Sequence, residues 1–549
     1  MGTQHLRCEV QLPASIRPFP TLLKEAGYFV TNYAKTDYNF SPEGIYHYWK
    51  KDYAPWRQRK DDEPFFSFFV LGDTHEGPGN TRTKYHSVVA NLPQEKRHDP
   101  AKANVPPYFP DTPKMRELWA RYYDLVSAMD AKVGQIIQAL EEDGLLEDTI
   151  IWFFSDHGHG LPRHKRWLLD SGLRVPLIVV LPEKYQHLAS ATSPGSIQQE
   201  LVSFVDFAPT VLNLAGLGIP NVMQGRPFLG PTSKAQRAYI YGARDRADDM
   251  FEVSRAIHDG RFVYVRHFLP HLPYVQAGRI MGNQKESMAE LRRARDSGEL
   301  DEVSSLIFAA SKPVEEFYDL EADPFEVHNL ARNPSYQSRV ETMRNALFDW
   351  IIEHRDTGML TEAEYQLRAK AQATTVYDMA QSVRYPIAEL LETADRSTRL
   401  ADAEDLKRWM KHTDSGVRYW AISALRNQTE SLPEKSVFLL HSALEDPSPS
   451  VAITAATVLC LEGHDAGLDT LKKQLISPHP LVALEAARAM LELGERAKPA
   501  VPYIESIRKG LEGQSGKRRY RDFNYASFTG WALEHALIQC GAALPSDFE

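Results

Sequence analysis

Short apolar runs that end abruptly at polar residues dominate the first third of the chain. Thr149–Phe154 has the length and the aromatic and β-branched content of a buried strand, and Asp156-His157-Gly158 follows it closely. Three further runs end in the same way: Phe65–Leu71 before Thr74-His75, Gly27–Asn32 before Lys35-Thr36-Asp37, and Val175–Leu181 at Pro182. The pattern predicts four strands with polar side chains at their carboxyl ends.

A long amphipathic helix is predicted between the runs Phe65–Leu71 and Thr149–Phe154. Its apolar positions recur every three or four residues from Pro113 to Leu140, and Gly144 marks its end. Strands that alternate with helices indicate an α/β fold, with a mostly parallel sheet flanked by helices. In such sheets ligands gather outside the carboxyl ends of the strands, where these polar residues lie.

The Asp156-His157 pair has two interpretations. Aspartate offers a hard oxygen and histidine a neutral nitrogen, so the pair can supply half of a divalent-metal site. Alternatively, Asp156 only caps the turn at the end of the strand.

The order of motifs along the chain resembles that of the type I sulfatases of the alkaline phosphatase superfamily. The resemblance covers roughly residues 1–355 and is closest to the heparan N-sulfatase-like branch. It rests on the following motifs: Gly27-Tyr28, Lys35, Thr74-His75, Asp130-x-x-Val133-Gly134, Asp156-His157-Gly158, Lys165, Arg174-Val175-Pro176, Val205-Asp206-Phe207-Ala208-Pro209-Thr210, Leu214-Ala215-Gly216, and Tyr318-Asp319-Leu320 with Asp323-Pro324 and Asn329-Leu330.

The resemblance implies roles for individual residues. Asp156 and His157 match one pair of calcium ligands, although relatives more often carry Asn at the second position, and an imidazole also suits another divalent metal. Lys35, His75 and Lys165 match the residues that clamp the sulfate group and assist the leaving oxygen. Ammonium groups stabilise the anionic oxygens, and an imidazole can protonate a departing alkoxide. Taken alone, each of these three would be a surface lysine or a structural histidine.

Two further residues are predicted to bind substrate. Asp37 stands where many family members carry a second histidine. Arg244, in the sequence Arg244-Asp245-Arg246, can contact a carboxylate or sulfate through two guanidinium bonds, or can belong to a surface salt-bridge cluster. The basic residues Arg163, Lys165 and Arg166 also suit a small anion.

The chain departs from the family at the nucleophile. Sulfatases of this type use a formylglycine made in a Cys/Ser-x-Pro-x-Arg motif, and an Asp-Asp pair near the start supplies further metal ligands. Cys8 is followed by Glu9-Val10-Gln11, and Asp61-Asp62 and Asp248-Asp249 do not close an apolar strand. We therefore expect the nucleophile segment to lie upstream of Met1 or to be lost, and the chain as given to be inactive.

Composition agrees with a large globular protein. Hydrophobic residues make up 43% of the 549 residues, and a net charge of −10 gives no reason to expect nucleic-acid binding. The three cysteines lie far apart, which argues against a disulfide framework. No transmembrane run or signal peptide is recognised, and the resemblance predicts a periplasmic or exported complete protein.

The character of the sequence changes after residue 355. We predict a sulfatase domain over 1–355 that lacks its nucleophile segment, a helical connector over 356–400, and HEAT-like helical repeats over 401–549. Turns rich in Pro and Asp precede Val417, Val451 and Val482, and they recur about every thirty residues before alanine-rich helices. Such repeats either dock a partner or a second copy of the chain, or cap the enzyme domain.

The sequence thus predicts a sulfatase that hydrolyses a sulfate ester or sulfamate on a sulfated small molecule or glycan. Two alternatives stay open. A phosphatase or phosphodiesterase of the same superfamily uses the same layout of metal and nucleophile. A non-catalytic pseudoenzyme would bind sulfated glycans without turnover.

Overall fold

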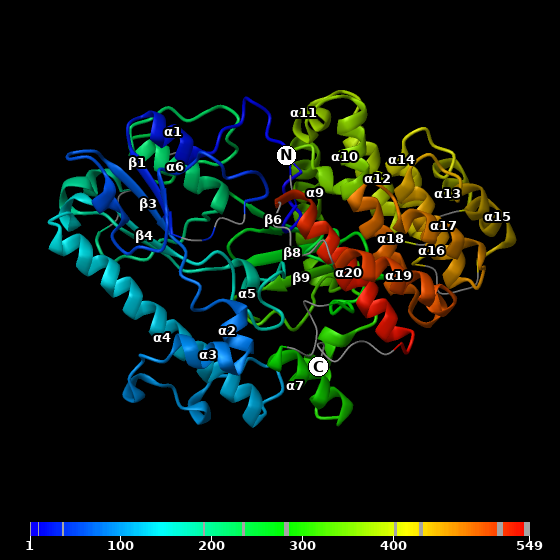
Figure 1. Cartoon of the computed structure of the whole chain (residues 1–549), viewed down its shortest axis with the longest axis horizontal. Coiled ribbons are helices and arrows are strands. Elements are labelled where there is room, and N and C mark those ends of the chain that lie inside the picture. Colours follow the sequence, from blue (N-terminus) through cyan, green and yellow to red (C-terminus); the bar gives the residue numbers. More distant parts are fainter. Residues whose placement is uncertain are drawn as a thin grey trace.

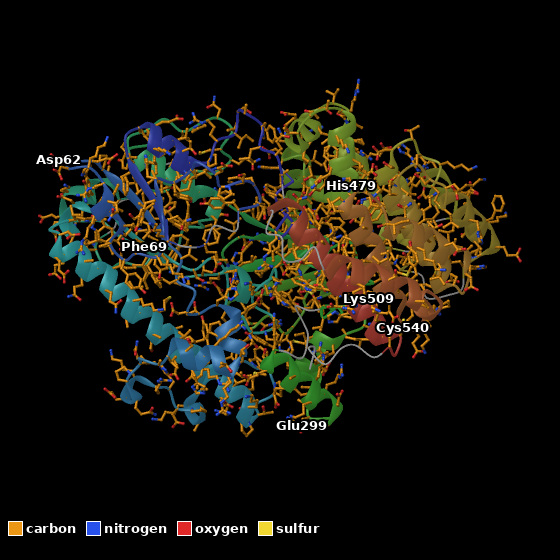
Figure 2. All side chains as sticks on the ribbon, in the orientation of Figure 1. Asp62, Phe69, Glu299, His479, Lys509 and Cys540 are labelled. Atoms are coloured by element: carbon orange, nitrogen blue, oxygen red, sulfur yellow. The ribbon has the colours of Figure 1, made fainter. Side chains whose placement is uncertain are left out.

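A computed structural model gives the fold of the chain (Figure 1). It describes residues 2–8, 10–33, 35, 38–189, 193–232, 237–278, 285–399, 403–427, 432–512 and 520–542. The strands and the long helix of the first third lie on one side of the molecule, and the helices of the last third lie on the other. The side chains in Figure 2 show the same division, with Phe69 and Asp62 on the first side and His479 and Cys540 on the second.

A three-stranded parallel sheet holds the first predicted strands. Its order is β2-β1-β3, with β1 over Phe29–Tyr33, β2 over Tyr48–Trp49 and β3 over Phe65–Phe69. β1 pairs with β3 from Phe29↔Phe65 to Tyr33↔Phe69. Helices α1 (Phe19–Glu25) and α6 (Phe207–Leu214) pack on it through Leu23 and Leu212, which form an apolar cluster with Val30.

The remaining two predicted strands pair with each other in the opposite sense. β4 (Ile151–Phe154) and β5 (Leu177–Val180) are antiparallel. The connection between them contains the short helix α5 (Asp170–Leu173), and the chain returns along β4 in the opposite direction. The α/β class is confirmed, but parallel pairing extends over fewer strands than the sequence pattern predicted.

The long helix is confirmed as α4, Pro113–Glu142. Thr112 caps its first turn by accepting a hydrogen bond from the Met115 N–H at 3.1 Å, and proline occupies the first helical position, where no N–H is needed. Gly144, with a φ of 68°, follows its last residue and turns the chain into β4.

A third sheet, of four antiparallel strands, stands at the centre of the molecule. Its strands are β6 (Ile240–Arg244), β7 (Ser254–His258), β8 (Phe262–His267) and β9 (Glu315–Asp319), in that order. Helix α9 (Gln337–Glu353) packs on it and contributes Val340 and Leu347 to a large apolar core with Ile257 and Phe317. The shorter helices around the sheets are α2 (Glu76–Asn80), α3 (Arg82–Val88), α7 (Glu286–Asp296) and α8 (Glu302–Ser305).

Helices fill the rest of the chain. Three of them, α10 (Glu362–Ala371), α11 (Val376–Gln381) and α12 (Ile387–Ser397), cover the predicted connector. The others alternate as outer and inner members of successive pairs: α13 (Ala403–Trp409), α14 (Ser415–Leu425), α15 (Glu434–Ala443), α16 (Pro449–Leu461), α17 (Ala466–Leu475), α18 (Pro480–Leu493), α19 (Val501–Glu512) and α20 (Tyr520–Gln539). In the part of the chain that the structure describes, no helix has the length and apolarity to cross a membrane.

The proline- and aspartate-rich turns join neighbouring helix pairs. Asp414 accepts a hydrogen bond from the Gly416 N–H at the start of α14, and Arg368 of α10 donates two bonds to the same carboxylate. Arg418 repeats this contact one pair later, donating two 2.7 Å bonds to Asp446. The turns before α14 and α16 thus also bind a side chain of a preceding helix.

One core runs across the predicted boundaries at residues 355 and 400. The cluster that contains Phe317 also contains Met359, Leu390 and Trp420, all buried. The Trp420 Nε1–H donates to the Met359 carbonyl at 2.9 Å. The boundaries themselves stay predictions, and the segment between them contributes Met359 and Leu390 to the main core.

Trp420→Ala tests this continuity. Removing a buried tryptophan is expected to lower the free energy of unfolding by about 3–5 kcal/mol. Phe438→Ala on α15, where the phenylalanine is 71% exposed, is the matched control and should change it by less than about 0.5 kcal/mol. Urea unfolding measures both, and an equally small effect of the two variants would contradict a shared core.

Candidate functional site

Three strand-end loops bring the predicted site residues together. β1 leads to Lys35, β3 leads to His75 at the start of α2, and β4 leads to Asp156 and His157. The loop after β4 continues to Lys165 and α5. Residues from distant parts of the sequence therefore meet at one end of the strands, as the pattern predicted.

The His75 imidazole and the Lys165 ammonium group form the centre of the site. Lys165 Nζ lies 3.5 Å from His75 Nε2, and the Lys165 side chain is only 11% exposed. The Gly77 N–H donates to His75 Nδ1 at 3.4 Å, which places the proton of the neutral ring on Nε2. Two donors therefore point toward each other, an arrangement that suits an anionic oxygen bound to both.

The pKa values of these two groups are lowered. Burial, together with the charge of Lys165, lowers the pKa of His75 to about 4. Burial, with the charges of Arg166 and Lys35, lowers the pKa of Lys165 to about 8, although Glu76 opposes the shift. At neutral pH the imidazole is therefore neutral and the ammonium is charged but close to its pKa, as a proton donor requires.

Glu76 anchors the cationic side chains around the site. Arg166 donates two 2.9 Å bonds to its carboxylate, and Lys285 donates one of 3.1 Å. Lys165 Nζ lies 3.9 Å from the same carboxylate. Burial opposes the ionisation of Glu76, but the bonds and charges of these cations hold its pKa well below the usual range.

The Asp156-His157 pair lies beside this cluster. The Asp156 carboxylate is 77% exposed, and its Oδ2 is 3.4 Å from His157 Nε2. His157 Nδ1 lies 2.6 Å from the Gly158 carbonyl, to which it donates, so Nε2 keeps its lone pair on the Asp156 side. Burial lowers the pKa of His157, so the ring is neutral at pH 7. An oxygen and a nitrogen on one side fit two ligands of a divalent ion, but no group of three or more such side chains converges among the described residues.

The glycines of the loop after β4 permit close backbone contacts. A Cβ on Gly158 would stand 2.0 Å from the Ser171 carbonyl oxygen, and one on Gly160 would stand 2.3 Å from Glu76 Cα. The loop therefore packs tightly between α2 and α5. This packing fixes Lys165 opposite His75.

Gly158→Ala is expected to destabilise the protein by about 1–3 kcal/mol because the methyl group meets backbone that cannot move aside easily. Gly134→Ala is the control, since no described atom lies within 4 Å of its added methyl group and the residue is inside α4. Gly134→Ala should leave the free energy of unfolding unchanged or raise it by up to about 1 kcal/mol. Thermal unfolding of both variants measures the difference, and equal effects would contradict the packing of the loop.

The other predicted site residues lie in different settings. Lys35 is exposed, and its charge lowers the pKa of both His75 and Lys165, which places it near the centre. Asp37 lies outside the described residues. Arg244 is buried, with its guanidinium 5.4 Å from the centre of the Trp167 ring, and its Nε has no partner among the described residues.

Two interpretations of basic residues are wrong. The Arg244-Asp245-Arg246 segment is not a surface salt-bridge cluster, because all three residues are buried and Arg246 pairs with Glu362. Arg163 and Arg166 do not face a small anion: Arg163 donates to the carbonyls of Phe325 and Glu326, and Arg166 bonds Glu76. An acceptor distant in the sequence binds each of these guanidinium groups, which sequence spacing does not reveal.

The sequence argument missed Glu76 and Lys285. Glu76 directly follows His75. An acidic residue next to residues predicted to bind an anion could have indicated that it pairs with a cationic side chain of the site. Lys285 precedes α7 and carries no comparable local signal.

Comparison with known proteins relates the first part of the chain to the sulfatases. The sulfatase family model matches residues 1–217. This part of the chain is sulfatase-like. An ulvan-active sulfatase of Formosa agariphila is 38% identical over 384 residues, which cover 64% of this chain and 62% of the relative. Human N-sulphoglucosamine sulphohydrolase is 26% identical, over 54% of this chain and 62% of its own length.

The matched region includes the loops described above. A solved structure of a 2-O GAG sulfatase is 16% identical, covers 64% of this chain and 78% of that chain, and has a TM-score of 0.43. The chain spans about 62% of the length of the first two sulfatase relatives. The sulfatase match covers Lys35, His75, Asp156, His157 and Lys165, but it ends before Arg244.

Proposed function

We propose that Lys35, His75 and Lys165 bind the sulfate group of a sulfated glycan, in an enzyme that hydrolyses a sulfate ester or sulfamate. The observation that carries the proposal is the pair of donors, Lys165 Nζ and His75 Nε2, 3.5 Å apart beside a third positive charge. Sulfate oxygens accept from such donors, and buried ammonium groups stabilise the charge that develops on them. The relatives named for ulvan and for N-sulphoglucosamine support a glycan substrate, and the second supports the N-sulfatase-like branch.

The residues have distinct roles in this proposal. Lys165, with a pKa of about 8, can give its proton to the departing oxygen, while His75 donates its Nε2–H to a sulfate oxygen. Arg244 and Asp37 contact the sugar. Asp156 and His157 hold one side of a divalent ion, Ca²⁺ or a similar metal, which would polarise the sulfate when bound.

Turnover requires a nucleophile in addition to these residues. The formylglycine motif Cys/Ser-x-Pro-x-Arg does not occur in the 549 residues, so we expect this chain as given to bind sulfated glycans without hydrolysing them.

The helices α13–α20 act in this proposal as HEAT-type pairs. The alternation of outer and inner helices and the repeated contacts of Arg368 with Asp414 and of Arg418 with Asp446 support this view. Since Trp409 of α13 and Trp420 of α14 belong to the same apolar cluster as the central sheet, we favour a structural cap over a docking surface.

Isothermal titration with matched oligosaccharides tests the function. A sulfated ulvan-type oligosaccharide should bind, and the same oligosaccharide after chemical desulfation should bind at least about tenfold more weakly, because its charge-assisted bonds are lost. A phosphorylated sugar serves as the comparator for the phosphatase alternative. Equal affinity for the sulfated and desulfated forms would contradict the proposal.

Binding should also depend on pH in a defined direction. The Lys165 ammonium group is charged below its pKa of about 8 and neutral above it, so affinity for the sulfated ligand should fall as the pH rises through that value. His75 stays neutral until the pH approaches its pKa of about 4, so affinity should be flat between these two values. Titrations across this range measure the pH dependence of affinity. If Lys165→Arg left the midpoint of that dependence unchanged, Lys165 would be excluded as its origin.

A further inference from the structure

A polar cavity of about 60 Å³ lies where the central sheet region meets the helical region. Residues of the loops around the sheet, including Leu269 and His271, form one wall. Thr454 of α16, Glu485 and Arg488 of α18, and Arg426, the residue that follows α14, form the other. The cavity is separate from the strand-end loops that carry His75 and Lys165.

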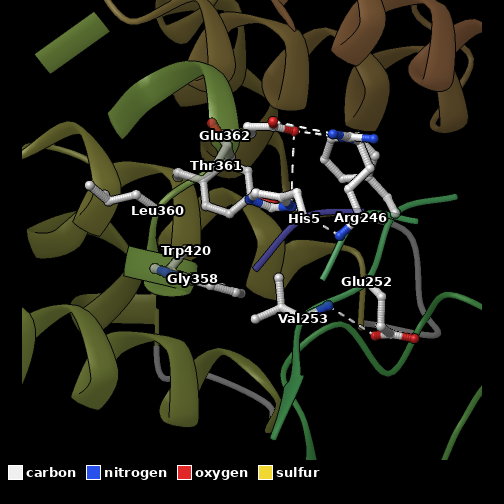
Figure 3. A pocket seen from close by; sticks show the side chains of 11 residues that line it. His5, Arg246, Glu252, Val253, Gly358, Leu360, Thr361, Glu362 and Trp420 are labelled. Atoms are coloured by element: carbon white, nitrogen blue, oxygen red, sulfur yellow. Dashed lines mark hydrogen bonds and ion pairs between the residues drawn. The ribbon is translucent and has the colours of Figure 1, made fainter. Parts of the chain in front are cut away.

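A smaller neighbouring hollow provides a contrast (Figure 3). Its volume is about 10 Å³, and Thr361 lines both spaces. In the smaller hollow Arg246 pairs with Glu362, and the Arg246 N–H donates to His5. Its charges are therefore already matched, and its volume leaves room for roughly one water molecule.

Four buried polar atoms on the larger cavity have no hydrogen-bond partner among the described residues. They are the Nε atoms of Arg426 and Arg488, His271 Nε2 and Glu485 Oε1. Buried polar atoms are nearly always hydrogen-bonded, so four on one cavity indicate a shared partner. Glu485 and Arg488 are 7% and 9% exposed, which excludes bulk water as that partner for most of their surface.

The bonds already made define which partner fits. Arg426 pairs with Glu492, and the terminal nitrogens of Arg488 donate to Gln276 and to the Ala277 carbonyl. Since guanidinium nitrogens only donate, both Nε–H groups need an acceptor.

His271 needs the opposite kind of partner. Asn427 Nδ2 donates to the Ser397 carbonyl, so Asn427 Oδ1 faces His271 Nδ1, 3.3 Å away, and accepts its proton. Burial keeps the pKa of His271 well below its ordinary value, so the ring is neutral and its Nε2 is an acceptor. The missing partner must therefore also carry a donor.

Glu485 accommodates an anion when it holds a proton. Burial raises its pKa to about 7, and Ser450 donates to its Oε2 at 2.6 Å. A protonated carboxyl group can donate to an anion instead of repelling it.

We propose that this cavity binds one small oxyanion that carries a hydroxyl group, of the hydrogen phosphate class. The Nε–H groups of Arg426 and Arg488 hold its oxygens, and its hydroxyl donates to His271 Nε2. At about 10–15 Å³ per water-sized group, the cavity has room for roughly four to six such groups, close to the size of a tetrahedral oxyanion. Occupancy ties the helical region to the sheet region and stabilises the folded chain.

Titration of the full chain with inorganic phosphate tests the site. The Lys165→Ala background weakens anion binding at the strand-end loops, and the cavity variants below then separate the cavity from those loops, so the outcome does not depend on the proposed function. We expect saturable binding of one phosphate per chain and a higher melting temperature. Sulfate at equal ionic strength, which has no hydroxyl group at neutral pH, should bind about tenfold more weakly.

Two further variants in the same background locate the binding. Thr454→Met fills the cavity without changing a charge, and Arg488→Lys keeps the charge but removes the Nε–H; each should weaken phosphate binding by about tenfold or more. Melting curves in chloride confirm that each variant is folded. Absence of saturable phosphate binding in Lys165→Ala, binding that neither variant weakens, or equal binding of sulfate would each overturn the proposal.

Discussion

Lys165→Ala is expected to weaken binding of a sulfated oligosaccharide by about tenfold to a hundredfold. The ammonium group is largely buried and faces His75 across 3.5 Å. One charge-assisted hydrogen bond to an anion contributes about 1.5–3 kcal/mol, which sets the size of the effect. Calorimetric titration at pH 7 measures it.

The control for this variant is Lys184→Ala. Lys184 is half exposed and pairs with Asp148 on the surface, so its removal takes away the same charge without touching the site. Equal losses of affinity in the two variants would mean that the ligand responds to net charge rather than to Lys165. Lys165→Arg retains the charge but changes its geometry, and it should fall between the wild type and Lys165→Ala.

Glu76→Gln is expected to lower the free energy of unfolding by about 3–5 kcal/mol, because it leaves buried cations without their shared carboxylate. Arg166 loses two 2.9 Å bonds to a charged group, and Lys285 loses one. The variant should also lower the pKa of Lys165, since the Glu76 charge is what holds that pKa up against burial. Its binding of a sulfated ligand should therefore decline at a lower pH than in the wild type.

Urea unfolding and a pH titration of binding measure these two effects separately. The exposed Glu95 offers a matched control, and Glu95→Gln should change stability by less than about 0.5 kcal/mol. If Glu76→Gln were as stable as the control, the carboxylate would not be the anchor of the cationic cluster. If stability fell but the pH midpoint stayed, Glu76 would have a structural role only.

The sequence predicted the strands that carry the site better than it predicted the contacts between the site's side chains. Apolar runs before His75 and Asp156 marked two strand ends correctly, because the end of an apolar strand is visible as a change in polarity, although both strands are half-buried rather than buried. The ion pair of Glu76 with Arg166 could not be predicted, since its partners are 90 residues apart and either could have faced solvent.

Pairing between strands was predicted less well for a similar reason. An apolar run reveals a strand but not its neighbour, so β4 and β5 were recognised while their antiparallel pairing was not. The connector was underestimated because its apolar residues are spread among charged ones. Met359, Leu390 and their neighbours become recognisable as core only when the helices bring them against the central sheet.

A crystal structure of this chain with a sulfated ulvan-type oligosaccharide tests the central claim most directly. The account predicts a sulfate group with oxygens about 2.7–3.2 Å from both Lys165 Nζ and His75 Nε2, on the side where Lys35 contributes its charge. A sulfate bound elsewhere on the surface, with the Lys165 and His75 side chains still facing each other without a ligand, would contradict it.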